Sequence, residues 1–187
     1  TGGYDWVLEG TSPVDRRGVC DGHAFVLLAY ARAVEAGLDG AEDRLEATYD
    51  LLIERFWEPH HDLCRSEYDG DFREGSAYRG QNANMHTSEA MLAAYEATDD
   101  RRYLDRAREI SYAITVDLAA ERNGLAWEHY TDAREHDTEY NRQNPHDTFR
   151  PWAYQPGHHA ERANLLSAHD RYDDADWALD RAAELFD

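Results

Sequence analysis

The sequence predicts an all-α protein built from helical hairpins, and one pattern that occurs three times carries this prediction. In each repeat an apolar helix is followed by a short turn and then by a second, amphipathic helix. The apolar side chains recur at spacings of three and four residues, which places them along one stripe of each helix. The three repeats cover residues 23–57, 89–114 and 161–185.

The helices and turns follow the same order in every repeat. The first helices contain residues 23–30, 89–95 and 161–166, the turns residues 38–40, 99–100 and 173–174, and the second helices residues 45–57, 103–114 and 177–185. The first helix of each pair is apolar around more of its circumference than the second. Such a helix is expected to be buried on more than one side.

Repeated helical hairpins stack, either as an open solenoid or as a closed toroid of inner and outer helices. The connecting stretches Glu58–Asn84 and Asn123–Gly157 are long and rich in glycine, aromatic and polar residues. Loops of this length usually carry function, whereas solenoid linkers are short. The second stretch also contains a candidate short strand around Leu125–Tyr130.

The charge balance is strongly acidic. The 187 residues include 39 acidic and 19 basic side chains, giving a formal net charge of -20, and every basic residue is arginine. A nucleic-acid-binding surface would be basic, so we expect no nucleic-acid partner. The acidic residues are spread over every segment, which is typical of proteins that work in concentrated salt. We interpret the chain as a halophilic, acidic protein.

The apolar runs are short, and Ala24–Tyr30 is among the longest. No run is long enough to span a bilayer, and no secretory signal is recognisable. The two cysteines, Cys20 and Cys64, form no metal-binding or redox pair in the sequence. We therefore expect a cytoplasmic protein with reduced thiols, a single domain over residues 1–187 and no membrane partner.

Each long connecting stretch ends in a His-x-x-Glu motif that enters an apolar helix. His86 and Glu89 form the first motif, and His158 and Glu161 form the second. Residues three apart share a face of a helix. Counting back from the apolar runs makes Asp21 the equivalent of His86 in the first hairpin. In a toroid these helix starts converge on one end of the central cavity, together with Arg79.

Two segments resemble the signatures of a known family. Asn82-x-Asn84-Met85-His86-x-x-Glu89-Ala90 and Pro156-Gly157-His158-x-x-Glu161 are similar to those of the N-acylglucosamine 2-epimerase family, including its mannose and sulfoquinovose isomerase branch. The resemblance extends over nearly the whole chain. It implies an (α/α)6 barrel of about six hairpins, of which this chain resembles the central three. We thus expect a single partial barrel domain.

The resemblance also implies a reaction. Family members move a proton between C1 and C2 of an aldose, ketose or N-acyl hexosamine through a cis-enediol or enediolate. This chemistry needs a base with a pKa near neutrality and hydrogen-bond donors for the enediolate oxygen. Histidine meets the first need. The expected partner is a monosaccharide, and we expect no cofactor and no metal.

The resemblance assigns roles to particular residues. It implies His158 as acid or base, Glu161 as its neighbouring carboxylate, and His86 as a substrate-contacting residue together with Asn82; we expect His158, Glu161 and His86 to be the catalytic residues. The substrate-binding residues we expect are Asn82, Arg79, Asp21 and Trp152.

The chain departs from the family pattern at several places. The isomerase branch has tyrosine near the position of Asp21, and tryptophan is common where Arg162 stands. A second acid/base histidine and a substrate-binding arginine lie in family regions that flank this chain.

Other interpretations stay open. Facing His and Glu side chains also suit a di-metal site, although that motif normally runs Glu-x-x-His. A glycoside hydrolase on the same barrel would need two carboxylates, with Glu161, Glu128 and Glu89 as candidates. A third alternative is a non-catalytic fragment. A half barrel would expose its inner helices, which predicts self-association.

Aromatic and histidine side chains in the long connecting stretches have two interpretations. Tyr78, Trp127, Trp152 and Tyr154 either form a wall on which a sugar stacks or pack the loops together. The remaining histidines in polar or acidic surroundings, which include His159 and His169, are expected at the surface.

Overall fold

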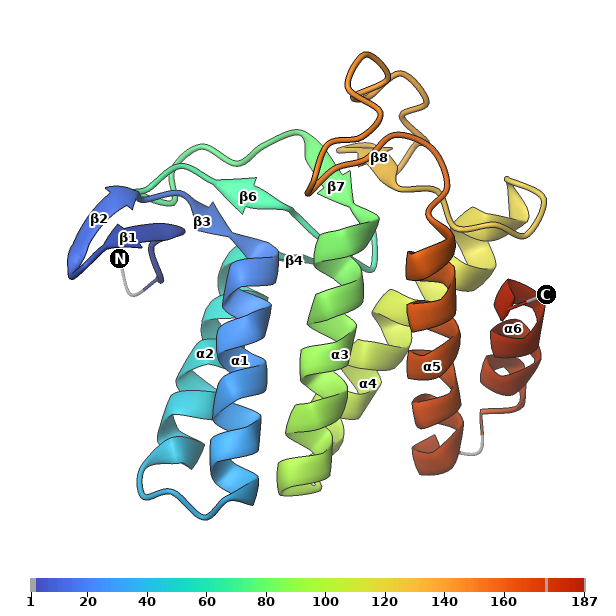
Figure 1. The fold of residues 1–187 in the computed structure, drawn as a ribbon. Helices are drawn as coiled ribbons and strands as arrows, with labels where there is room; N and C mark the ends of the chain where they lie inside the picture. The colour runs from blue at the N-terminus through green and yellow to red at the C-terminus, as the bar shows by residue number, and fades with distance from the viewer. Residues whose placement is uncertain (1–2, 174, 187) are drawn as a thin grey trace.

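Three helical hairpins stand next to one another in the computed structural model, which describes residues 3–173 and 175–186 (Figure 1). The first hairpin consists of α1 (Cys20–Glu35) and α2 (Ala41–Arg55), the second of α3 (Gln81–Thr98) and α4 (Arg101–Tyr112), and the third of α5 (Pro156–Asp173) and α6 (Asp176–Phe186). A π-helical segment, η1 (Ala113–Leu118), extends α4. The predicted order of helices is confirmed for the described residues; of the turn predicted at residues 173–174, residue 174 lies outside the described residues.

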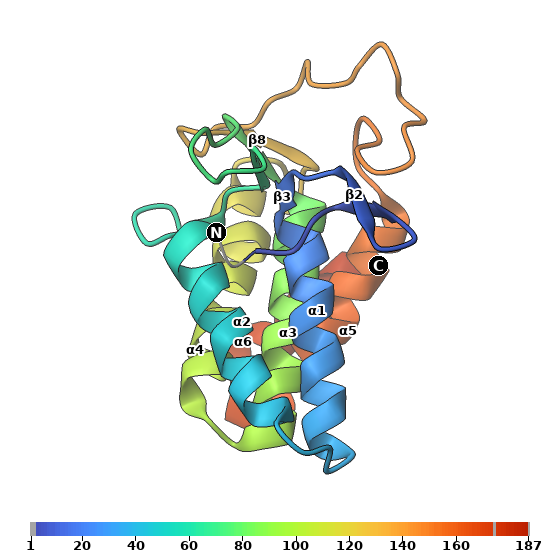
Figure 2. The same ribbon diagram turned by 90° about the vertical axis from the view of Figure 1, so that its left-hand side faces the viewer.

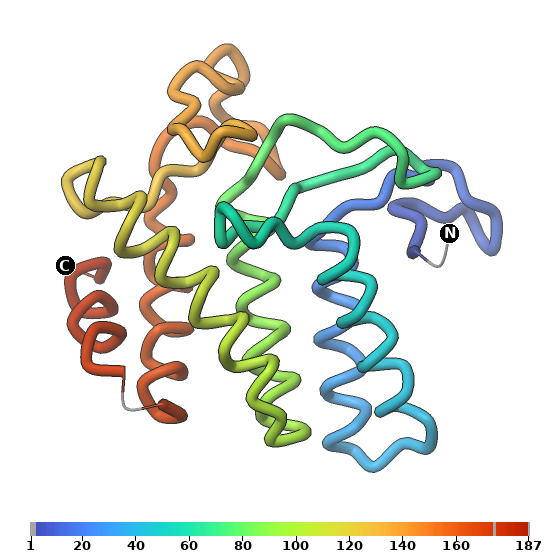
Figure 3. The backbone as a smooth tube through the Cα atoms, turned by 180° about the vertical axis from the view of Figure 1, so that it is seen from behind, coloured from blue at the N-terminus to red at the C-terminus, as the bar shows by residue number. Residues whose placement is uncertain are grey.

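The helices form two layers. Helices α1, α3 and α5 stand in a row and begin at the same end of the molecule (Figure 1). Helices α2 and α4 lie behind them, and α6 lies beside α5, as the view from behind shows (Figure 3). The predicted convergence of the first helices' N-termini on one end is therefore observed, and this end carries the long connecting segments.

Short antiparallel strand pairs cover this end (Figure 2). The four pairs are β1 (Val7–Glu9) with β2 (Ser12–Asp15), β3 (Gly18–Val19) with β6 (Glu67–Tyr68), β4 (Trp57–Glu58) with β5 (Leu63–Cys64), and β7 (Tyr78–Gly80) with β8 (His129–Thr131). The candidate strand around Leu125–Tyr130 is displaced toward the C-terminus, since β8 shares only His129 and Tyr130 with it. Trp57, which we expected at the end of a helix, lies in β4 instead because α2 ends at Arg55.

The helix starts differ from the sequence interpretation in one respect that matters for the site. Helix α3 begins at Gln81, directly after β7, so His86 is its sixth residue. Asp21 is the second residue of α1, and its counterpart in α3 is therefore Asn82, not His86. Counting from the apolar runs failed because pairing of β7 with β8 brings the chain into α3 earlier than the apolar run begins.

Two separate apolar clusters hold the fold together. The large one lies mainly between α1, α2, α3 and α4, where it includes Leu27, Leu52, Met91 and Leu104, and it reaches α5 at Leu165. The small one lies between α5 and α6 and contains Ala163, Leu166, Ala175, Ala178, Ala182 and Leu185. Tyr95 on α3 and Tyr172 on α5 both pack against the large cluster, and their ring centroids are 5.3 Å apart.

The longest helices of the described residues carry polar and charged side chains throughout. None of them has an apolar stretch that would reach across a bilayer.

Candidate active site

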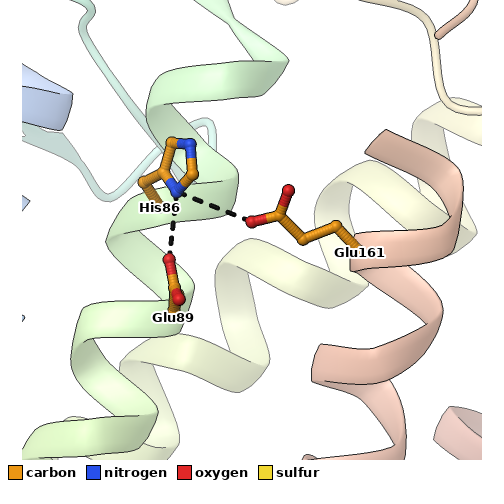
Figure 4. Close-up of side chains that lie close together, drawn as sticks. All are labelled: His86, Glu89 and Glu161. Atoms are coloured by element: carbon orange, nitrogen blue, oxygen red, sulfur yellow. Dashed lines mark hydrogen bonds and ion pairs between the residues drawn. The ribbon is translucent and has the colours of Figure 1, made fainter. Parts of the chain in front are cut away.

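A histidine and two carboxylates meet between α3 and α5 (Figure 4). The Nδ1 atom of His86 lies 3.0 Å from Oε2 of Glu89, one turn along α3, and 3.7 Å from Oε1 of Glu161 on α5. The ring of Phe25 lies 4.6 Å from that of His86, centroid to centroid. Two helices thus bring together side chains that are far apart in the sequence, on the end where the connecting segments gather.

The same three side chains have the composition of a cation site. One imidazole nitrogen and two carboxylate oxygens lie within 4.8 Å of one another. Zinc and related cations use these ligand types. A hydrogen bond from His86 to Glu89 accounts for the arrangement without a cation, so the contacts by themselves do not require a metal.

His158 is held from a different direction. Its Nδ1 atom lies 2.9 Å from Oε2 of Glu128, in the segment just before β8. Glu128 is only 2% exposed, whereas the side chain of His158 keeps 22% of its surface accessible. Although His158 and Glu161 are three residues apart on α5, the carboxylate near His86 is that of Glu161, and the carboxylate bonded to His158 is that of Glu128.

Glu128 was missed as a partner of His158 in the sequence interpretation, which considered it only as a hydrolase carboxylate. It follows Trp127 in an irregular connection, and no helical spacing relates it to His158. The one available signal was an acidic residue inside an otherwise apolar candidate strand. A buried carboxylate of this kind needs a partner, so its position alone points to a functional or structural pair.

The electrostatics of His158 follow from its neighbours. Burial by itself lowers the pKa of His158, but the hydrogen bond and the charge of Glu128, with a smaller contribution from Glu161, outweigh burial. The net result is a pKa above the ordinary histidine value. Arg162, the other charge that acts on His158, is fully buried, and burial lowers its own pKa to about 10.

Asn82 and Asp21 meet beside a pocket of about 230 Å³. The Nδ2 amide of Asn82 donates a hydrogen bond of 3.2 Å to Oδ2 of Asp21. The pocket lies between the N-terminal segment, the strands and the long segment before α5, and its walls include Trp6, Arg17, Glu67, Tyr78, Phe149 and Arg150. The structure thus places Asn82 and Asp21 together at one pocket, and their substrate-binding role stays a prediction.

Arg150 anchors the segment that covers this pocket. Its guanidinium donates to the hydroxyl of Tyr140 at 2.8 Å and to the carboxylate of Glu67 at 2.7 Å, and it lies over the ring of Tyr78 at 4.6 Å. Tyr78 in turn stacks on Tyr140, with centroids 4.4 Å apart. The sequence interpretation did not single out Arg150, because nothing in a loop sequence tells which arginine turns inward.

Arg79 is placed elsewhere than we expected. Its side chain is 1% exposed and forms a two-point ion pair with Glu58, one contact of which is 2.6 Å. A further N–H donates to the carbonyl of Ser76 at 3.0 Å. Because β7 alternates its side chains, Arg79 points into the layer of strands, away from the helix start where Asn82 lies.

Trp152 serves to pack the long segment. Its indole N–H donates to the carbonyl of Thr138 at 2.8 Å, and its ring meets that of Trp127 edge-on with centroids 6.2 Å apart. Trp127 is buried and packs in the same way against Tyr154, with centroids 4.9 Å apart. Of the two interpretations of these aromatic residues, these contacts favour packing over an exposed stacking wall.

Two histidines that we discussed as surface residues are buried. His159 is 8% exposed and His169 is 0% exposed, because each lies on the side of α5 that packs against the remaining helices and connecting segments. His129 in β8 is also buried, with Nε2–H donating to the carbonyl of Pro151 at 2.9 Å, so Nδ1 accepts from the hydroxyl of Tyr78 at 2.8 Å.

Acidification is expected to destabilise the protein through His129 and His169. Burial lowers the pKa of each to about 4, while an unfolded histidine titrates near 6.5, about its ordinary value. The unfolded chain therefore binds protons first as the pH falls, and stability is lost between about pH 6.5 and 4. Urea unfolding at several pH values in this range measures the slope. His169→Leu should make it shallower, whereas His60→Ala, at an exposed position, should leave it unchanged. An equal slope in His169→Leu would contradict the prediction.

Comparison with known proteins identifies the family to which the chain belongs. Residues 1–187 match the profile described as N-acylglucosamine 2-epimerase (GlcNAc 2-epimerase). The chain belongs to the N-acylglucosamine 2-epimerase family. The resemblance that the two His-x-x-Glu motifs indicated is thereby confirmed.

The most informative relatives are D-mannose isomerases. The chain is 45% identical over 188 residues to the one from Marinomonas mediterranea, covering 100% of this chain and 48% of that protein. It is 36% identical over 191 residues to the one from Pseudomonas cannabina pv. alisalensis, covering 99% of this chain and 46% of that protein. The chain therefore spans about half the length of the curated relatives it matches.

Solved structures agree on the fold. A crystal structure of D-mannose isomerase superposes with a TM-score of 0.95 at 44% identity, over 98% of this chain and 47% of that one. Cellobiose 2-epimerase from Bacillus thermoamylovorans B4167 gives a TM-score of 0.82 at 14% identity, over 98% of this chain and 47% of that one, and shows the fold alone. The three hairpins are thus part of a helical toroid, which decides between the solenoid and the toroid.

Proposed function

We propose that this chain carries catalytic residues of a sugar isomerase or epimerase that moves a proton between C1 and C2 of a monosaccharide. The single observation that carries the proposal is His158, a partly accessible imidazole held at Nδ1 by the buried carboxylate of Glu128. Such an arrangement leaves Nε2 as the proton-accepting atom. A base of this kind is what formation of an enediolate requires.

The other site residues fit supporting roles. His86 and Asn82 lie on α3, on the turns that follow the start of the helix, where they can donate hydrogen bonds to sugar hydroxyls or to the enediolate oxygen. Glu161 lies 3.7 Å from His86 and completes the link between α3 and α5. The N-termini of α1, α3 and α5 add partial positive charge at this end, which favours a developing oxyanion.

In the reaction we propose, His158 removes the proton from C2 of the open-chain sugar and an enediolate forms. Return of the proton to C1 converts an aldose to a ketose, and return to the other face of C2 inverts that centre. The similarity to D-mannose isomerases favours the first outcome, with D-mannose as substrate. Arg79 and Trp152 are left out of the proposed substrate site because their side chains are engaged in ion pairing and packing.

Deuterium exchange tests the proposal. The purified chain in molar salt is mixed with mannose, glucose, fructose or N-acetylmannosamine in deuterated water, and the C1 and C2 protons are followed by NMR. We expect exchange with mannose and fructose that is lost in His158→Ala and retained in His60→Ala. Exchange that persists in a folded His158→Ala variant would refute the role of His158. A folded wild-type chain without exchange would favour the non-catalytic alternative.

Product analysis separates the isomerase from a glycoside hydrolase. Two solved structures of family 76 glycoside hydrolases share the fold at 13% identity, one of them with a TM-score of 0.68. Release of a free sugar from a mannoside, without interconversion of mannose, would favour the hydrolase alternative.

Several expectations from the sequence remain predictions: adaptation to high salt, a cytoplasmic location, a single domain and self-association. Sedimentation velocity in molar salt tests the last of these. A monomer at all concentrations would contradict self-association.

A further inference from the structure

The position of Glu128 is fixed by its backbone and by the buried residues on either side of it in the sequence. Its backbone carbonyl accepts a hydrogen bond of 2.9 Å from the N–H of Gln81, the first residue of α3. Its neighbours Trp127 and His129 are buried as well. The side chain is therefore held in place by the junction of β8 with α3, and it reaches α5 through the 2.9 Å contact with Nδ1 of His158.

The surroundings of Glu128 leave His158 as its main partner. Among the described residues, Oε1 of Glu128 has no hydrogen-bond partner, and neither do Nη1 of Arg162 and the hydroxyl of Tyr130, both of which are buried. The positive charge of Arg162 interacts with the carboxylate of Glu128. The guanidinium of Arg162 is fixed by hydrogen bonds of 3.0 and 3.2 Å to Oε1 of Gln81. A buried carboxylate needs such a counter-charge to remain ionised.

We infer that Glu128, and not the motif residue Glu161, is the positioning residue for His158. Its carboxylate accepts the Nδ1–H of the imidazole and selects the tautomer whose Nε2 lone pair is free to take a proton from the sugar. Arg162 supports this role by compensating the charge of Glu128. The inference rests on the proposed function for its catalytic consequence, but the tautomer is a property of the protein alone.

The contribution of a carboxylate that orients a catalytic histidine can be measured as a change in kcat. In the serine-protease triad, replacing the equivalent aspartate by its amide leaves the wrong tautomer and lowers kcat by about 10⁴-fold. Three charged groups act on His158 here, namely Glu128, Glu161 and Arg162. The direct hydrogen bond distinguishes Glu128 from the other two.

Matched amide variants test the inference. Nitrogen-15 NMR of the histidine side chains, titrated from about pH 5 to 9 to bracket the protonation of histidine, reports the tautomer and the pKa of His158. In the wild type we expect the neutral ring to carry its proton on Nδ1. Glu128→Gln should lower the pKa and bring in the Nε2–H form, whereas Glu161→Gln, which removes the same charge, should leave the tautomer unchanged.

Kinetics provide the second readout. Glu128→Gln should lower kcat for C2 proton exchange by about 10² to 10⁴-fold, with KM within about twofold and the acidic limb of the pH profile shifted with the NMR pKa. Loss of activity with an unchanged tautomer would reduce Glu128 to a structural role. A tautomer that changes in Glu161→Gln and not in Glu128→Gln would overturn the inference.

A further variant guards against misfolding. Glu128→Gln leaves the buried charge of Arg162 uncompensated, so Glu128→Gln/Arg162→Met restores neutrality and should fold if the single variant does not. Because the NMR experiment needs no turnover, a chain without isomerase activity would refute the proposed function and still leave the tautomer test decisive for Glu128.

Discussion

Replacing Arg79 with methionine is expected to lower the free energy of unfolding by about 3–5 kcal/mol. The variant leaves the carboxylate of Glu58 without its main partner in the layer of strands, where Arg79 now forms a two-point ion pair with it. It also removes the donor to the carbonyl of Ser76. Removing one member of a buried pair costs more than the pair contributes, because the other charge stays behind. Chemical denaturation at neutral pH measures the loss.

Two variants serve as controls for Arg79. Arg65 contacts the same carboxylate at 2.8 Å but keeps 23% of its side chain exposed, so Arg65→Met should cost clearly less. Glu58→Gln combined with Arg79→Met removes both charges and should recover part of the loss. If Arg79→Met kept full stability and instead raised KM, the substrate-binding role that the sequence suggested for Arg79 would be right.

Asn84→Ala is expected to destabilise the fold by about 2–4 kcal/mol. The amide of Asn84 is fully buried and ties the start of α3 to β5. Its Oδ1 accepts from the N–H of Cys64 at 2.7 Å, and its Nδ2 donates to the carbonyls of Cys64 at 3.2 Å and Gly80 at 2.8 Å. Alanine would leave these backbone groups buried without partners. Thermal and urea unfolding report the change.

The neighbouring asparagine of the same motif provides the contrast. Asn82 is partly accessible and makes a single side-chain hydrogen bond, to Asp21. Asn82→Ala should therefore change the free energy of unfolding by less than about 1 kcal/mol and raise KM for the sugar. Equal losses of stability in the two variants would mean that the Asn-x-Asn motif is structural at both positions.

The helical hairpins could be predicted from the sequence because each helix is indicated by the spacing of apolar residues within its own segment. The apolar stripes of residues 23–30, 89–95 and 161–166 correspond to α1, α3 and α5, the layer that begins at the site. The helix starts were harder to locate, since they depend on pairing between β7 and β8, which lie about 50 residues apart in the sequence. The misplacement of Asp21 against His86 has this cause.

Contacts of the site between residues of one helix could be predicted from the sequence, whereas contacts between distant segments could not. The spacing of His86 and Glu89 predicts a shared helix face, and the two side chains are in contact. The same spacing in His158 and Glu161 gives no such bond, because Glu128 reaches His158 from another segment. Arg79 and Arg150 illustrate the same limit, since a single sequence does not tell that Arg79 pairs with Glu58 and Arg150 with Glu67.

The division of the apolar interior into two clusters has a consequence for ligand binding. The cluster between α5 and α6 is small, and the buried member that α5 adds to the large cluster is Leu165, so this hairpin has little of its own to resist local opening. His86 lies on α3, whereas Glu161 and His158 lie on α5, which borders both clusters. A sugar that contacts both helices therefore binds only when α5 is docked against α3. By mass action we expect such a ligand to protect the amides of α5 and α6 from hydrogen exchange, because its binding free energy adds to the stability of the docked hairpin.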